Sequence, residues 1–101
     1  MVNMIKVNIN DNIIKITGHA DFDDTGKDIV CASVSSIVYT TINGICNIDK
    51  DAISFIDTSS LLEIKILKKE EIVNVLINSM IELLSDLEKQ YPKNIKIIKG
   101  E

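Results

Sequence analysis

The sequence of 101 residues has no arginine or tryptophan, and it has a single histidine, a single proline and two cysteines. All eleven basic residues are lysines, against fifteen acidic residues, so the net charge is −4. Binding to a phosphate backbone needs clustered positive charge, and arginine is the usual bidentate ligand of guanine and phosphate. These absences argue against direct contact with nucleic acid.

The same scarcity argues against a metal or a bound cofactor. One histidine and two distant cysteines do not match the spacing of zinc ligands, and the chain lacks a glycine-rich phosphate loop and a dinucleotide fingerprint. Cys31 and Cys46 are fifteen residues apart, which is about 22 Å along one helix, so they are not expected to form a disulfide.

Targeting segments are not evident either. Residues 1–9 alternate between polar and apolar side chains and lack the continuous apolar core of a signal peptide. The longest uncharged run, residues 29–48, contains serine, threonine and asparagine, which makes it look too polar to span a membrane. We therefore expect a cytoplasmic protein with reduced cysteines and no membrane contact.

The hydrophobic pattern predicts one domain, residues 1–101, with the element order ββαββαβ. Strands are expected over residues 2–9, 13–17, 52–56, 62–66 and 94–98, because apolar and polar residues alternate there. Asn10, Asp11 and Asn12 suit a turn with left-handed backbone. Helices are expected from about Asp28 to the break at residues 49–51, and from residues 70–71 to Pro92. The order favours an α+β fold with a largely antiparallel sheet and both helices packed on one face.

The two helices differ in their apolar faces. The second is expected to bury a stripe that consists of Ile72, Val73, Leu76, Ile77, Met80, Leu83, Leu84 and Leu87. The first follows a helical spacing through Val30, Val34, Ile37, Val38, Thr41 and Ile45, and it has no charged face. One sheet cannot cover such a helix, so we expect a homodimer with part of Val34 to Ile45 at the interface and Ile42 pointing outward.

One stretch combines the residues that carry chemistry. Gly18-His19-Ala20 follows the second strand, and Gly26-Lys27-Asp28-Ile29-Val30-Cys31-Ala32 opens the first helix. A thiol near a helix N-terminus is favoured as thiolate, and a neighbouring imidazole would take its proton and return it to a leaving amine. On its own the pair is weak, since a lone cysteine is usually a small buried hydrophobe.

The string itself resembles the signature of the ribosomal-processing cysteine protease family, Prp. The resemblance extends over essentially the whole chain, with Ser33 where the family more often has alanine or glycine. It implies that Cys31 is the nucleophile and His19 its general acid and base, without a cofactor. It also suggests a homodimer, and a substrate that is the precursor of a large-subunit ribosomal protein with a short N-terminal extension.

Other residues near the motif have alternative roles. Asp28 either caps the helix or orients the imidazole of His19, and the cap is the simpler role. Ser35 lies one turn after Cys31 and either contacts substrate backbone or bonds the carbonyl four residues earlier. Gly18 and Gly26 bound an acidic loop whose Phe22 either touches substrate or belongs to a solvated connector. Cys46 is expected to serve packing only.

The expected function is therefore that of a cysteine endopeptidase that removes the extension of the ribosomal protein. A hydrophobic groove beside Cys31 and the acidic loop beyond it would suit a peptide that is apolar before the cleavage site and basic after it. The alternative is a non-catalytic dimeric adaptor for ribosome assembly, in which the motif shapes a peptide-binding groove. A redox sensor is a weaker reading, because Cys31 has no resolving cysteine close in sequence.

Overall fold

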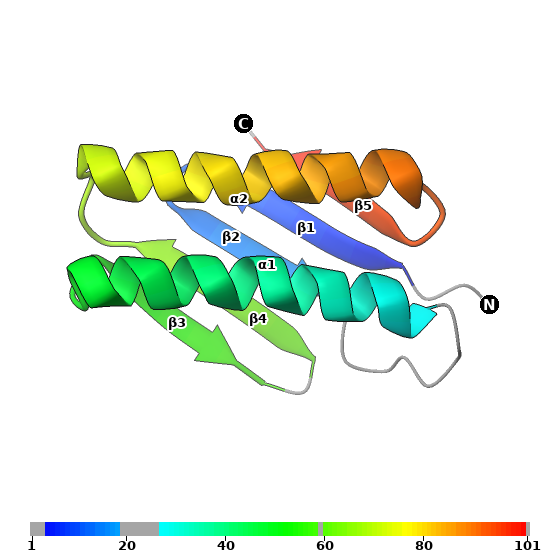
Figure 1. Ribbon diagram of the computed structural model, residues 1–101, viewed down its shortest axis with the longest axis horizontal. Coiled ribbons are helices and arrows are strands. Elements are labelled where there is room, and N and C mark those ends of the chain that lie inside the picture. Colours follow the sequence, from blue (N-terminus) through cyan, green and yellow to red (C-terminus); the bar gives the residue numbers. More distant parts are fainter. Residues whose placement is uncertain (1–3, 19–26, 59, 101) are drawn as a thin grey trace.

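The architecture is a five-stranded sheet with two helices on one of its faces, as a computed structural model shows (Figure 1). The structure describes residues 4–18, 27–58 and 60–100. Seven elements follow one another: β1 (Ile5–Asn10), β2 (Ile13–Thr17), α1 (Lys27–Ile48), β3 (Ile53–Asp57), β4 (Leu61–Ile66), α2 (Glu71–Gln90) and β5 (Ile95–Lys99). This confirms the predicted order and fold class, with element ends shifted by one or a few residues.

The sheet has the strand order β3-β4-β2-β1-β5. Pairings β1–β2, β2–β4 and β3–β4 are antiparallel, whereas β1 pairs with β5 in parallel, with Val7 opposite Ile97. Asp11 has a φ of 36° in the turn between β1 and β2, which confirms the expected left-handed backbone. Both edges of the sheet are formed by strands from the second half of the chain, β3 and β5.

The core lies between the sheet and the two helices. Alternate side chains of the strands, such as Val7, Ile16 and Ile64, point to the helices and are fully buried. The helices contribute Val30, Val34, Val38, Ile42 and Ile45 from α1, and Val73, Ile77, Met80, Leu84 and Leu87 from α2. The helices run antiparallel, so the start of α1 lies beside the end of α2 (Figure 1).

Three expectations about helix faces are wrong. Ile42 is 7% exposed and belongs to the core, so it does not point outward. The stripe of α2 is narrower than predicted, because Ile72 and Leu83 are about half exposed while their neighbours Val73 and Leu84 pack on the sheet. Cys46 is exposed and does not serve packing. A sheet covers only one side of each helix, so apolar residues beyond that side remain in solvent.

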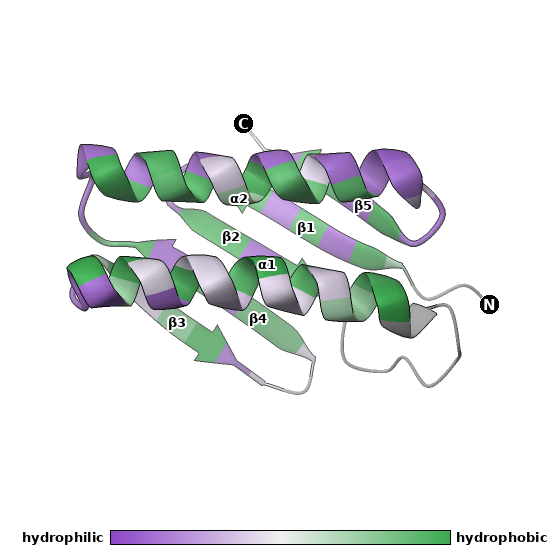
Figure 2. Ribbon diagram, viewed as in Figure 1, coloured by the Kyte–Doolittle hydropathy of each residue, from purple (hydrophilic) through white to green (hydrophobic). Residues whose placement is uncertain are grey.

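Helix α1 also corrects the membrane argument. By length and mean hydropathy alone, Ile29–Ile48 is apolar enough to cross a membrane, so its polar residues do not exclude a span. Core helices of soluble proteins satisfy the same criterion. Here every turn of α1 from Val30 to Ile45 buries an apolar side chain against the sheet, while 28% of the apolar span as a whole is buried. Figure 2 shows the contrast with α2, which alternates hydrophilic and hydrophobic bands.

Candidate active site

Strand β2 ends in a backbone conformation that only glycine adopts readily. Gly18 has a φ of 82°, and a Cβ atom there would overlap the carbonyl oxygen of Met4, just before β1. The chain therefore turns sharply at Gly18 while staying in contact with the neighbouring strand. His19 follows immediately, and it lies with Phe22 and Gly26 in the segment 19–26, outside the described residues.

Cys31 is the fifth residue of α1 and lies in its N-terminal part, as predicted. Its side chain is half-buried and packs against the core cluster. The helix begins at Lys27, so Asp28 lies inside the first turn instead of before it, and its side chain is outside the described part of the structure. Backbone N–H groups in the first turn of a helix have no partner within the helix, so they are available to an oxyanion.

The direction in which Cys31 faces follows from its neighbours on α1. Cys31, Ser35 and Tyr39 are spaced by four residues and therefore form one flank of the helix. Tyr39 packs edge-on against Phe55 of β3, with ring centroids 5.7 Å apart and an interplanar angle of 86°. Its hydroxyl donates a hydrogen bond to the carboxylate of Asp57 at the end of the same strand. The flank with Cys31 thus faces the β3–β4 hairpin and points away from α2.

The Asp57 contact also fixes the protonation state of Tyr39. The hydrogen bond to Asp57, together with partial burial and the negative charge of that carboxylate, raises the pKa of Tyr39 to about 12. Tyrosine is ordinarily protonated at neutral pH, and the raised pKa keeps this phenol a donor further into the alkaline range. Tyr39 was not predicted as a site residue, although its spacing of eight residues from Cys31 was a usable signal.

Ser35 is half-buried on the flank with Cys31, as predicted. The backward hydrogen bond considered for it is made by other residues of α1: Ser33 Oγ donates to the carbonyl of Ile29 at 2.8 Å, and Thr41 Oγ1 donates to that of Ile37 at 2.9 Å. The described structure gives no such bond for Ser35, so its hydroxyl is available to other partners.

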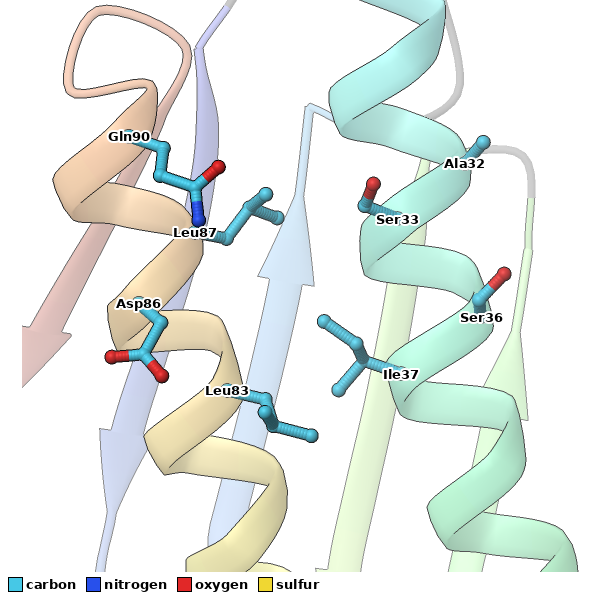
Figure 3. Close-up of a pocket in the computed structure, with 8 residues that line it drawn as sticks. All are labelled: Ala32, Ser33, Ser36, Ile37, Leu83, Asp86, Leu87 and Gln90. Atoms are coloured by element: carbon cyan, nitrogen blue, oxygen red, sulfur yellow. The ribbon is translucent and has the colours of Figure 1, made fainter.

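A groove lined by both helices is the next feature of α1. It has a volume of about 580 Å³ and runs between the two helices (Figure 3). Its lining residues are Ala32, Ser33, Ser36, Ile37, Leu83, Asp86, Leu87 and Gln90. Ser33 and Ile37 point toward α2, about 200° around the helix from Cys31 and Ser35. Cys31 is not among the lining residues, so this groove is not the one expected beside the thiol, and sequence reasoning did not find it.

Metal chemistry has no support in the part of the chain that the structure describes, where no group of three or more His, Cys, Asp and Glu residues is placed to hold an ion. What this part offers is a half-buried thiol near the start of α1, and a strand, β2, whose end leads into the chain's one histidine. A thiol in such a place is typical of hydrolases that use a cysteine nucleophile.

Comparison with known proteins identifies the family. The profile of the family described as cysteine protease Prp matches residues 4–96, so the chain belongs to this family and is a cysteine protease. The ribosomal processing cysteine protease Prp of Mycoplasma genitalium is 32% identical over 93% of this chain and 94% of its own length. That of Bacillus subtilis is 28% identical over 82% of this chain and 80% of its own length.

Solved structures share the fold. A Staphylococcus aureus structure, described as an essential ribosomal processing protease Prp with a covalently linked product peptide, superposes with a TM-score of 0.86. It is 23% identical and covers 96% of this chain and 100% of its own. Membership in a protease family also removes the ground for reading the motif as that of a non-catalytic adaptor or a redox sensor.

Proposed function

We propose that this protein is the endopeptidase that removes a short N-terminal extension from the precursor of a large-subunit ribosomal protein. Two relatives bear the name ribosomal processing cysteine protease, and the S. aureus protein has been crystallised with a substrate peptide. The observation that carries the proposal is the position of Cys31, half-buried near the start of α1 on the flank that faces the β3–β4 hairpin.

The proposed chemistry uses Cys31 as the nucleophile and His19 first as a general acid and then as a general base. The Cys31 thiolate attacks the scissile carbonyl carbon and forms a carbon–sulfur bond, while N–H groups of the first turn of α1 stabilise the oxyanion. The carbon–nitrogen bond then breaks, and His19 protonates the departing amine. Water, deprotonated by His19, hydrolyses the thioester and releases the extension with a free carboxylate.

The supporting residues enter as parts of the same proposal. Ser35 would contact substrate backbone from the next turn of α1. Asp28, inside the first turn of α1, would interact with the positive end of the helix or orient His19, and Phe22 and Gly26 would contribute from the segment 19–26. Gly18 would set the direction in which the chain enters that segment, since it has a left-handed backbone. The proposal needs no cofactor and places the protein in the cytoplasm, where ribosomal precursors are made.

The test is incubation of the purified protein with the precursor and measurement of the new N-terminus by mass spectrometry. The unmodified protein is expected to release one defined extension. Cys31→Ala should abolish the release, whereas Cys46→Ala, the matched control on the same helix, should retain it. Unchanged processing by Cys31→Ala would contradict the assignment of the nucleophile, and loss in Cys46→Ala alone would point to the other thiol.

We also propose a homodimer that forms through the outer surface of the helix pair. No charged residue occurs between Ile29 and Ile48 of α1, Ile29 is 57% exposed, and Leu83 of α2 is 51% exposed across the groove. An uncharged helix surface with exposed aliphatics beside a groove is what a self-complementary contact would cover. This places the interface on the solvent-facing side of α1, and not at the buried Ile42.

A further inference from the structure

The flank of α1 that presents Cys31 continues toward the C-terminus of the helix into an aromatic surface. Tyr39 lies eight residues after Cys31 on this flank, and its side chain remains 39% exposed. Phe55 is half-buried beneath it, so the exposed part of Tyr39 sits on a fixed apolar base. Tyr39 thus presents a partly exposed aromatic ring on the flank of α1 that carries Cys31.

The position of Tyr39 is held from two directions. The edge of its ring meets Phe55, and its hydroxyl donates to Asp57 at the end of β3. A side chain fixed at both ends loses little conformational entropy when a ligand packs on it. Pre-organised aromatic residues of this kind are common anchors for apolar side chains of a partner.

The distance to Cys31 selects one residue of the substrate. Eight residues of helix correspond to about 12 Å along the axis. An extended peptide advances about 3.3 Å per residue, so a chain that runs along this flank covers the distance in about three to four residues. The side chain that reaches Tyr39 is therefore separated from the scissile bond by that number of positions.

We infer that Tyr39 forms a specificity subsite for an apolar substrate side chain three to four residues from the scissile bond, with Asp57 as the residue that positions the phenol. The inference rests on the proposed function, because it takes Cys31 as the nucleophile. It adds a second point of recognition outside the Cys31–His19 pair. It also explains why an acidic side chain at the end of β3 is turned toward the helix.

The test uses a peptide that spans the cleavage site of the precursor, and variants of it in which each apolar residue is replaced by serine. In the unmodified protein, serine at one position three to four residues from the scissile bond should lower kcat/KM about tenfold. In Tyr39→Ala the preference for the apolar residue over serine should disappear. The kcat/KM of the parent peptide should fall by about the same tenfold, while that of the serine peptide should not change further. Tyr39→Phe should keep part of the preference, because the ring still packs on Phe55 but the hydrogen bond to Asp57 is lost.

Matched variants keep a structural effect apart from a loss of recognition. Thr40→Ala changes an exposed neighbour on another side of α1 and should leave all peptides unaffected. If Tyr39→Ala does not fold, Tyr39→Leu tests the same contact, because it keeps an apolar group and should retain part of the preference. Asp57→Asn should weaken the preference less than Tyr39→Ala does.

The outcomes separate the subsite from the function. Cleavage of the parent peptide by the unmodified protein, with serine preferences that are identical in Tyr39→Ala, would overturn the subsite and leave the protease assignment intact. The subsite would also be overturned if Tyr39→Ala abolished the effect of serine only at the residue next to the scissile bond. No cleavage of the parent peptide or of the full precursor would overturn the proposed function, and the subsite with it.

Discussion

Cys31 lies near the start of α1 and its proposed partner His19 follows β2 in sequence, so their cooperation depends on how close the chain after β2 comes to the start of α1. A histidine beside the thiol would favour the thiolate when protonated, because its positive charge adds to that of the helix N-terminus. The pair would then be most reactive where the thiolate and the imidazolium coexist. This dependence is measurable without any substrate.

We predict that His19→Ala slows alkylation of Cys31 by iodoacetamide near neutral pH. The rate of the unmodified protein should rise at lower pH than that of the variant, since the variant lacks the nearby positive charge. Mass spectrometry of the modified peptide separates Cys31 from the exposed Cys46, which serves as an internal control. Superimposable pH profiles for Cys31 would show that His19 does not act on the thiol.

Gly18 offers a second test at the scale of single residues. We predict that Gly18→Ala lowers the free energy of unfolding by about 1–3 kcal/mol, because a left-handed φ is costly for alanine and its Cβ would overlap Met4. Gly44→Ala is the control, since nothing lies within 4 Å of a Cβ there and the residue is helical. It should stabilise by about 0.5–1 kcal/mol. Equal effects in urea denaturation would contradict the account of Gly18.

At the scale of elements, the side of α2 that packs on the sheet determines which of its leucines stabilise the fold. Leu84 is fully buried and Leu83 is 51% exposed, although they are neighbours in sequence. We predict that Leu84→Ala destabilises by about 2–5 kcal/mol, through lost burial and a cavity, and Leu83→Ala by less than about 1 kcal/mol. Thermal unfolding of the two variants at low protein concentration, where a dimer would contribute least, provides the measurement.

An ion pair joins the end of α1 to the connection between β4 and α2. Lys68 Nζ lies 3.0 Å from a carboxylate oxygen of Asp49. The hydrogen bond from Lys68, aided by the backbone N–H of Asp51, lowers the pKa of Asp49, and Asp49 in turn raises the pKa of Lys68. Asp49 therefore contributes stability above its ordinary pKa, and that contribution is lost as pH falls through the lowered value.

We predict from these signs that Lys68→Met is slightly less stable than the unmodified protein near neutral pH. The difference should shrink as the solution is acidified below the ordinary range of aspartate, because Asp49 is then protonated in both proteins. It should also shrink at strongly alkaline pH, where Lys68 is deprotonated. Unfolding midpoints recorded across the pH range provide the test, and a constant difference down to acid pH would contradict it.

Sequence patterns predicted the elements better than their faces. Alternation in β1 and β4, and the acidic start and proline end of α2, depend on neighbours in sequence, so all seven elements were predicted in order. The phase of α1 was harder to predict, because a helix without charged residues gives no polar side from which to infer the buried one. Ile42 was therefore placed outward although it lies in the core. Tyr39 was overlooked because its partners, Phe55 and Asp57, are distant in sequence.

Strand order and quaternary structure belong to the scale of the whole molecule. The order β3-β4-β2-β1-β5 depends on contacts between distant segments, and alternation within a strand carries no information about its neighbour. The distance between His19 and Cys31 likewise depends on the folded chain. The family resemblance and the short segment between the two residues favour a close approach, but they do not give a distance. The strand order is known only from the folded structure, whereas the homodimer and the contact between His19 and Cys31 are predictions.

We predict that the unmodified protein is a dimer at micromolar concentration, and that Ile29→Asp gives a folded monomer. Because Ile29 is exposed, an aspartate at this position would place a charge in the proposed contact without disturbing the core. Ile56→Asp is the matched control, because Ile56 is 45% exposed on β3, outside the helix pair, and should leave the dimer intact. Light scattering that shows a monomer for the unmodified protein would contradict the proposed interface.

The parallel pair of β1 and β5 has a consequence for the way the protein is made. Residues 5–9 are synthesised well before residues 95–99, which are their partners in the sheet. Until β5 has been synthesised, β1 is an open edge strand with unpaired backbone groups. The nascent chain therefore keeps one side of its sheet unfinished until β5 has emerged and paired with β1.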